Sequence, residues 1–202
     1  MTLIINKPRT TPHHRPLIAL TGPKGSGKDA AAKIITKCLV QPNGEYNIFK
    51  HIKFAGPLKD ACRELFGWDD RHLEGNLKEV VDERYGVSPR KAMQTLGTEW
   101  GRNIINPNLW TEVARNRIRE IKYGLVIVSD CRFDNEAQMI HDEGGIVIQV
   151  VRPGTSPVAE HASELGVSSE LIDMTIDNSG TLDDLSVSIK RLGLKCIFGL
   201  NR

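Results

Sequence analysis

The sequence contains no long apolar run. None of its runs approaches the ~18 residues of a membrane-spanning helix, and the N-terminus has neither the apolar core nor the cleavage site of an export signal. Its four cysteines lie far apart and match no metal-binding spacing (Cys38, Cys62, Cys131 and Cys196). We interpret them as buried or incidental thiols in a reducing compartment. These absences predict a cytoplasmic protein that does not enter a membrane.

Acidic residues are missing from the start of the chain, where the first acid is Asp29. Residues 1–15 carry only basic charges and are predicted to form a mobile basic extension. The net charge of the whole chain is only +2, which does not indicate a dedicated nucleic-acid binder. With 202 residues and 40% hydrophobic content, residues 16–202 are expected to form a single α/β domain with a real core.

A phosphate-binding loop dominates the first part of the sequence. An apolar run, Leu17 to Leu20, leads into Gly22–Lys28, in which two glycines bracket four residues and a lysine follows. The glycines let successive backbone N–H groups turn inward around phosphate oxygens. The helix expected after the loop adds its positive N-terminal end, and Lys28 adds a point charge. The chain is therefore predicted to bind a nucleoside triphosphate.

The residue after the loop lysine departs from the usual pattern. A hydroxyl that ligates magnesium is normal there, whereas this chain has Asp29 followed by Ala30. A carboxylate also binds hard cations. A second acid, Asp130, follows the apolar run Leu125–Ser129, at the strand end where phosphate-loop enzymes keep a magnesium-directed carboxylate. Asp29 and Asp130 are the predicted metal ligands.

Strand and helix patterns alternate along the chain. Strands are expected at residues 17–20, 46–54, 125–129, 146–151 and 174–176. Helices are expected after the loop, at 57–66, from 89, from 107 to about 122, from 134 to about 143, and from 181 to about 192. Residues 68–86 are charged and weakly patterned, and are predicted to form a mobile, helical or irregular insertion. This alternation predicts a parallel sheet in a three-layer α/β sandwich of the phosphate-loop kinase type.

The helix that starts at Ser88-Pro89 has an unusual face. Arg90, Gln94, Gly97 and Gly101 fall on one stripe of it. One interpretation is a platform that a ligand approaches closely. The other is a solvated face whose small residues allow a second helix to come near. The sequence leaves both open.

Missing motifs narrow the reaction class. A signalling GTPase carries an Asn-Lys-x-Asp guanine reader, but the only such pair here, Asn6-Lys7, precedes the first strand and lacks the Asp. A motor ATPase normally has a Glu after the strand-end Asp, where this chain has Cys131. A kinase acting on a small acceptor remains. Its chemistry needs charge neutralisation and positioning, for which Arg90, Arg132 and Arg152 are suited.

Further short motifs follow one another from about residue 17 to 192. They are the Gly-Ser-Gly-Lys-Asp loop (25–29), Ala55–Ala61, Arg90-x-x-x-Gln94-x-x-Gly97-Thr98, Asp130-x-Arg132, Val150–Gly154, His161-x-x-Glu164 and Asn178-x-Gly180-Thr181-Leu182. Their order resembles that of the tailed-phage deoxynucleoside monophosphate kinases. An Asp after the loop lysine is usual in that family, although Thr is more common where this chain has Ala30.

The resemblance implies a phosphate-loop nucleoside monophosphate kinase fold, with a helical acceptor-binding part at about 56–122 and a lid-like loop at about 152–166. It implies phosphoryl transfer from ATP, with Mg²⁺, to a deoxynucleoside monophosphate. By matched motif, the ATP-binding residues are Lys24, Gly25, Ser26, Gly27, Lys28, Asp29 and Ala30. The monophosphate-binding residues are Lys24, Leu58, Lys59, Arg90, Gly97, Trp110, Asp130, Arg132 and Glu136. Catalytic roles fall to Lys28, Arg90, Asp130 and Arg132.

The role of Trp110 and the reaction itself each have an alternative that the sequence leaves open. Trp110 suits a core aromatic as well as a nucleotide contact. The reaction has two competing hypotheses: a kinase for another small phosphorylated acceptor such as phosphomevalonate, or a non-catalytic nucleotide-binding or nucleic-acid-associated protein. Dimers occur in the family, which favours a homodimer, and a phage-encoded member would act in the host cytoplasm. The sequence does not specify which bases are accepted.

Overall fold

The computed structural model describes residues 16–39, 49–155 and 166–198. The basic extension, the start of the strand expected at 46–54 and the His161/Glu164 motif lie outside the described residues. The chain divides into two compact units, one made of residues 1–53 and 117–202 and the other of residues 54–116. The division into a mobile extension and one domain stays a prediction.

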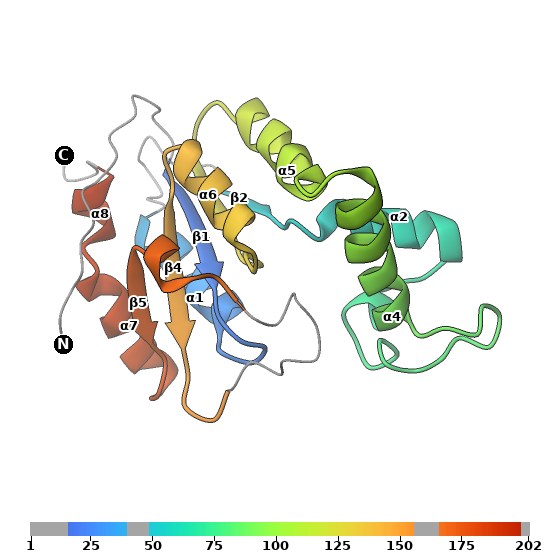
Figure 1. Ribbon diagram of the computed structural model, residues 1–202. Helices are drawn as coiled ribbons and strands as arrows, with labels where there is room; N and C mark the ends of the chain where they lie inside the picture. The colour runs from blue at the N-terminus through green and yellow to red at the C-terminus, as the bar shows by residue number, and fades with distance from the viewer. Residues whose placement is uncertain (1–15, 40–48, 156–165, 199–202) are drawn as a thin grey trace. The chain divides into compact units, whose positions relative to one another are not determined.

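The first unit is built on a parallel sheet (Figure 1). Among the described residues its strands are β1 (Leu17–Thr21), β2 (Phe49–Ile52), β3 (Leu125–Val128), β4 (Ile146–Val151) and β5 (Met174–Asp177), in the spatial order β2-β3-β1-β4-β5. Central β1 pairs with β3 and β4, so that Ile18 lies opposite both Ile127 and Ile146. Buried apolar runs such as β1 and β3 are typical of strands covered on both faces. The predicted parallel sheet is confirmed.

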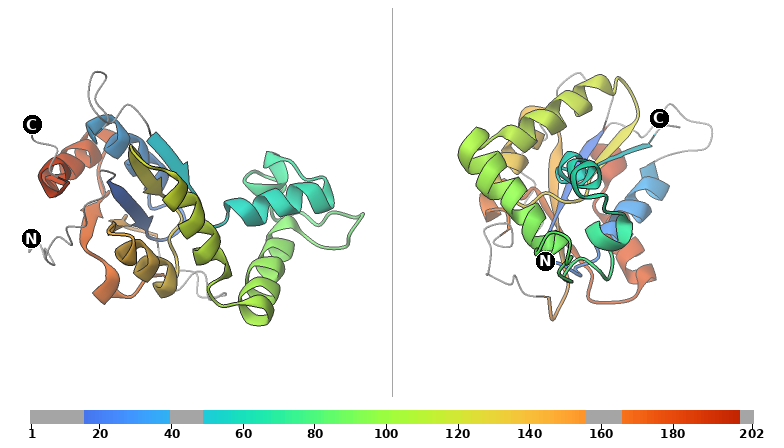
Figure 2. Two further views of the ribbon diagram at one scale, coloured as in Figure 1. Left: turned by 90° about the horizontal axis from the view of Figure 1, so that it is seen from above. Right: turned by 90° about the vertical axis from the view of Figure 1, so that its right-hand side faces the viewer.

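Helices cover both faces of this sheet, as Figure 2 shows. The helices of the unit are α1 (Lys28–Leu39), α6 (Asp134–Asp142), η3 (Ser169–Leu171), α7 (Leu182–Arg191) and α8 (Leu194–Ile197). Ile18 and Leu20 point to the face that α1 and α7 cover, whereas Leu17 packs near Ile140 of α6 on the opposite face. The alternation along β1 thus creates the predicted three layers. The short helix α8 was not predicted.

The second unit is helical. It contains α2 (Gly56–Phe66), α3 (Asp70–Leu73), α4 (Pro89–Gln94), the π-helix η1 (Thr95–Ile105) and most of α5 (Leu109–Glu120). Gly67 ends α2 with a φ of 66°, and the Ser88 hydroxyl caps α4 by accepting from the Lys91 N–H at 3.3 Å. These predicted boundaries are confirmed. The π-helix was not predicted, and α5 begins two residues after Pro107.

The charged stretch after α2 surrounds an aromatic cluster that the sequence analysis did not foresee. Trp68 is only 2% exposed, stacks on Phe66 at 4.3 Å between ring centroids, and donates its indole N–H to Asp82 at 2.8 Å. Tyr85 contacts Phe66 edge-on. Hydrogen bonds from Arg84 and Trp68 hold the pKa of Asp82 well below its usual range. Through Trp68 and Leu73, residues 68–86 join the apolar core that α2, α4 and α5 share.

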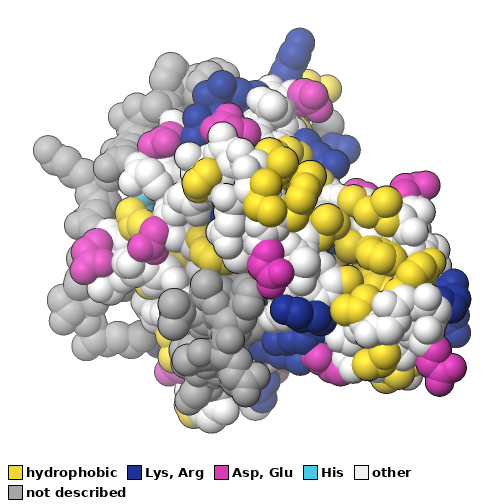
Figure 3. Space-filling view, turned by 45° about the vertical axis from the view of Figure 1, so that its right-hand side comes forward, with side chains coloured by type: hydrophobic (Ala, Val, Ile, Leu, Met, Phe, Trp, Pro, Cys, Tyr) yellow, Lys and Arg dark blue, Asp and Glu magenta, His cyan; other side chains and the backbone are white. Residues whose placement is uncertain are grey.

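The surface of the second unit also carries large apolar side chains (Figure 3). The most exposed of them are Ile104, Leu65, Val81 and Val80. No helix within the described residues is long and apolar enough to cross a membrane.

Trp68→Ala should destabilise the second unit by about 3–5 kcal/mol, because it removes a fully buried ring from the aromatic cluster. The matched control is Trp100→Ala on the same unit, since Trp100 is 43% exposed. Urea unfolding followed by far-UV circular dichroism, with hydrogen exchange of residues 54–116, measures both. Equal losses for the two variants would contradict the assigned core.

Candidate functional site

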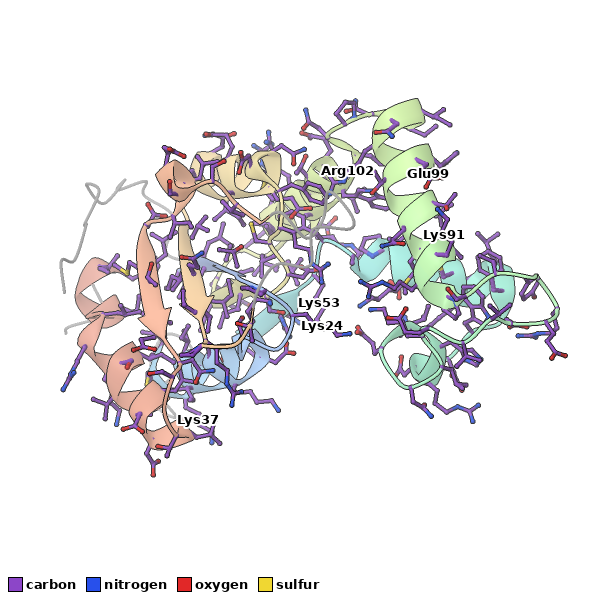
Figure 4. All side chains as sticks on the ribbon, turned by 60° about the horizontal axis from the view of Figure 1, so that its bottom comes forward. Lys24, Lys37, Lys53, Lys91, Glu99 and Arg102 are labelled. Carbon is purple, nitrogen blue, oxygen red and sulfur yellow. The ribbon has the colours of Figure 1, made fainter. Side chains whose placement is uncertain are left out.

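The glycine-rich loop lies between the end of β1 and the start of α1. Three of its glycines have positive φ angles, 135° at Gly22, 81° at Gly25 and 96° at Gly27, which other residues rarely adopt. The Lys28 ammonium folds back over the loop and donates to the carbonyl oxygens of Gly22 at 2.7 Å and Pro23 at 2.8 Å. Lys24, labelled in Figure 4, is exposed. A positively charged amine and a helix N-terminus therefore meet at one curved loop.

Two neighbouring segments hold the loop in place. A Cβ at Gly22 would lie 2.4 Å from the carbonyl oxygen of Val150 in β4, so the loop passes too close for any side chain. Asn178, just after β5, donates its side-chain amide to the Ser26 carbonyl oxygen at 2.8 Å. A Cβ at Gly27 would lie 2.2 Å from that amide nitrogen. Sequence analysis predicted the loop but missed the Asn178 contact.

The two predicted metal ligands influence the same histidine in β2. Burial and the charge of Lys53 lower the pKa of His51, while Asp29 and Asp130 oppose that shift. The His51 ring nitrogen Nε2 lies 2.6 Å from the Ser129 hydroxyl at the end of β3. Sequence analysis missed His51, because an edge-strand histidine carries no pattern of its own. Both carboxylates therefore lie near enough to His51 to act on it electrostatically.

These two acids suit a magnesium ion that also takes phosphate oxygens and water. Mg²⁺ is commonly held by one or two carboxylates together with substrate phosphates. Within the described residues, no group of three or more His, Cys, Asp or Glu residues could hold a metal by itself. Metal binding by Asp29 and Asp130 stays a prediction. At the neighbouring position, the Ala30 side chain packs against the sheet core and offers no hydroxyl.

The turn after β3 positions Arg132. The Cys131 N–H donates to the Leu20 carbonyl of β1 at 3.2 Å, which ties the turn to the strand that precedes the glycine-rich loop. Glu136 is 2% exposed, and its Oε2 accepts from the backbone N–H groups of Arg132 at 2.8 Å and Phe133 at 3.2 Å. This carboxylate caps the start of α6. Arg132 itself is exposed. A nucleotide contact by Glu136 or Arg132 stays a prediction.

In the second unit, three predicted acceptor residues pack together. Leu58 and Trp110 are each 8% exposed, and the Trp110 indole N–H donates to the Gly97 carbonyl oxygen at 2.7 Å. A Cβ at Gly97 would lie 3.0 Å from Leu58, and one at Gly101 would lie 2.9 Å from Trp110. The two glycines therefore admit side chains from neighbouring helices, as one interpretation expected, but both are buried and do not lie on a solvated face. Ligand contact by Gly97 or Trp110 stays a prediction.

The two predicted phosphate-binding cations of this unit are paired with acids. Lys59, whose side chain is 13% exposed, forms an ion pair with Glu74. Arg90 forms one with Glu79 at 3.2 Å, and its backbone N–H donates to the Lys78 carbonyl oxygen at 2.9 Å. Glu74 and Glu79 are 44% and 58% exposed, so both pairs are accessible to solvent. An anionic ligand would have to exchange with these carboxylates.

Comparison with known proteins identifies the family. The family model described as deoxynucleotide monophosphate kinase matches residues 68–189. A protein of Acanthamoeba polyphaga mimivirus that carries the same description is 34% identical over 183 residues, covering 83% of this chain and 91% of that protein. The chain belongs to the deoxynucleotide monophosphate kinase family. The deoxynucleotide monophosphate kinase of Enterobacteria phage T4 is 34% identical over 145 residues, covering 65% of this chain and 59% of that enzyme.

The family model matches from residue 68 onward and does not include the glycine-rich loop. Among solved structures, shikimate kinase from Acinetobacter baumannii aligns with 90% of this chain and 94% of its own, at a TM-score of 0.45 and 14% identity.

Lys28→Ala should reduce phosphoryl transfer about a hundredfold or more while the fold survives, because it removes the charge that the loop presents to a triphosphate. Lys37→Ala is the matched control, since Lys37 is exposed on the same helix. Steady-state turnover and thermal unfolding measure the two effects. Near wild-type kcat in Lys28→Ala would show that this loop does not act on a phosphate.

Proposed function

We propose that this chain transfers the γ-phosphoryl group of ATP to a deoxynucleoside 5′-monophosphate, giving ADP and a deoxynucleoside diphosphate. The observation that carries the proposal is the glycine-rich loop with Lys28 held over it, at the carboxyl end of a central parallel strand. Open α/β sheets bind ligands at that edge. Membership of the deoxynucleotide monophosphate kinase family supplies the acceptor class.

On the ATP side, the loop residues from Lys24 to Ala30 would surround the phosphates. Lys28 would exchange the carbonyl oxygens of Gly22 and Pro23 for phosphate oxygens, which carry more negative charge. Asp29 and Asp130 would hold Mg²⁺, which supplies charge neutralisation on the phosphates when bound. Ala30 contributes no hydroxyl, so the loop relies on backbone N–H groups, the helix N-terminus and Lys28.

On the acceptor side, Arg90 and Lys59 would bind the monophosphate after leaving Glu79 and Glu74. A guanidinium matches two phosphate oxygens at once and stays charged at any physiological pH. Arg132 is exposed beside Asp130 and would neutralise charge that develops on the transferring group. Leu58, Gly97 and Trp110 would supply the apolar packing beneath the site.

The proposal also covers the oligomeric state and the location of the protein. The family supports a homodimer that acts in the cytoplasm, or in the host cytoplasm if a phage encodes the chain. Transfer to an unrelated phosphorylated acceptor such as phosphomevalonate is not favoured, because the relatives of this chain are described as deoxynucleotide kinases.

A panel of acceptors tests the proposal. The four deoxynucleoside monophosphates, the four ribonucleoside monophosphates and phosphomevalonate are each supplied with ATP, and ADP release is followed by a coupled assay. ADP release that depends on at least one deoxynucleoside monophosphate is expected. Release with phosphomevalonate alone, or equal release without an acceptor, would refute the proposed reaction.

Arg90→Ala should raise KM for the monophosphate about thirty- to a thousandfold, because a bidentate charge-assisted pair is worth roughly 2–4 kcal/mol. KM for ATP should change no more than a few-fold. Arg90→Lys should restore little, since an ammonium cannot reproduce the fork. The measurement is a pair of substrate titrations for each variant. A larger effect on ATP than on the monophosphate would move Arg90 out of the acceptor site.

Glu79→Gln should have the opposite effect and lower KM for the monophosphate. The gain should not exceed about fivefold, because exposed ion pairs contribute only ~0–1 kcal/mol. Glu83→Gln is the matched control, being exposed on the same segment. Unchanged KM in Glu79→Gln, or an equal change in both variants, would show that Glu79 does not compete for Arg90.

A further inference from the structure

We propose that Asn178 is a positioning residue of the ATP site, which fixes the Ser26–Gly27 peptide so that the Gly27 N–H is presented to bound phosphate. The inference rests on the proposed function of the glycine-rich loop. It assigns a role to a residue that contacts the loop from the opposite end of the chain.

The Asn178 side chain extends from a backbone that is itself fixed. Asn178 follows β5 directly and is 7% exposed. Its backbone N–H donates to the Val151 carbonyl oxygen of β4 at 2.8 Å. On the other side of the turn, the Asp177 carboxylate accepts from the Ser179 N–H at 2.9 Å. The amide group thus reaches the loop from a defined place at the edge of the sheet.

The hydrogen bond it makes has a defined direction. Asn178 Nδ2 lies 2.8 Å from the Ser26 carbonyl oxygen, and only the NH₂ end of the amide can donate to a carbonyl. The hydroxyl of Ser26 is buried and has no hydrogen-bond partner among the described residues. The protein therefore holds the loop by its backbone carbonyl and not by the serine side chain.

Holding this carbonyl also orients the next N–H group. The C=O and N–H of a trans peptide point in opposite directions, and the described residues contain no cis peptide bond. When the Ser26 carbonyl points to Asn178, the Gly27 N–H points to the other side of the same peptide plane. Gly27 has a φ of 96°, and glycine populates positive and negative φ values about equally well. The Ser26 N–H donates to Pro23 and the Gly27 carbonyl oxygen accepts from Ala31, so the Asn178 bond restrains the peptide that lies between these two contacts.

Close packing supports the same role. Because a Cβ at Gly27 would lie 2.2 Å from Asn178 Nδ2, the amide fills the space that a side chain at Gly27 would need. A restraint that exists before ATP arrives removes an ordering cost from binding. The residue acts through the loop peptide, so its loss should affect ATP and spare the acceptor.

The test replaces the donor by an acceptor of the same shape. In Asn178→Asp, a carboxylate would face the Ser26 carbonyl, and in Asn178→Ala the space is left without a donor. Ser179→Ala is the matched control, since Ser179 is exposed in the same turn and its backbone N–H is retained. Calorimetric titration with ADP measures nucleotide affinity without turnover, and substrate titrations give KM for ATP and for the monophosphate.

The expected result is an increase of about ten- to a hundredfold in the Kd of ADP and the KM of ATP for both Asn178 variants. KM for the monophosphate should stay within about threefold of wild type, and Ser179→Ala should match wild type. The affinity of Asn178→Asp should partly recover as the pH is lowered, because a protonated carboxyl group can donate to the carbonyl again.

Equal changes in both KM values, or a lower melting temperature with unchanged ADP affinity, would overturn the proposal. Absence of pH recovery in Asn178→Asp alongside wild-type ADP binding in Asn178→Ala would do the same. The two Asn178 variants keep the test decisive if one of them fails to fold. Since ADP binding needs no acceptor, a wild-type protein that binds ADP but phosphorylates no monophosphate would refute the proposed reaction separately.

Discussion

The site depends on a backbone loop that must present its N–H groups to phosphate without collapsing on itself. Glycines give the loop this conformation, and the same glycines would let it relax. The protein counters this freedom with contacts to neighbouring strands. The Val150 carbonyl oxygen packs closely against Gly22, and the Asn178 amide donates a hydrogen bond to the Ser26 carbonyl oxygen. In the order β3-β1-β4-β5, strand β4 is the neighbour of β1 and β5 comes next. The sheet topology therefore places Val150 and Asn178 where they can restrain the loop that follows β1.

Charge is arranged differently in the two units. In the first, the Lys28 ammonium donates to two backbone carbonyl oxygens. These neutral acceptors are weaker partners for an ammonium than charged phosphate oxygens are. In the second, Lys59 and Arg90 rest on the exposed carboxylates of Glu74 and Glu79. The carboxylates are more exposed than their cations, since the Lys59 and Arg90 side chains are only 13% and 30% exposed. The acids come from residues 68–86, a segment in which the buried Trp68 ring donates a hydrogen bond to Asp82.

The sequence predicted the elements that follow from local rules. Strand β1, the loop, the start of α4 at Ser88 and the strand-end Asp130 all follow from short-range patterns, and the structure has them as expected. It did not predict contacts that depend on the fold. Asn178 lies 152 positions from Ser26, and no local pattern connects the two. Trp68 was read with its charged neighbours, although its burial depends on Phe66 and Tyr85. Beyond Gln94 the chain forms a π-helix, so Gly97 and Gly101 do not follow the α-helical spacing from which the stripe was predicted. The family resemblance supplied the residue roles that remain predictions.

The central claim is that one phosphoryl group passes from ATP to a deoxynucleoside monophosphate. Phosphorus NMR of a mixture of ATP, Mg²⁺, one accepted monophosphate and the protein observes the fate of that group directly. The account predicts that the β-phosphorus signal of the deoxynucleoside diphosphate appears in step with ADP, while inorganic phosphate stays at background. Accumulation of inorganic phosphate with ADP, and no diphosphate signal from the acceptor, would contradict it.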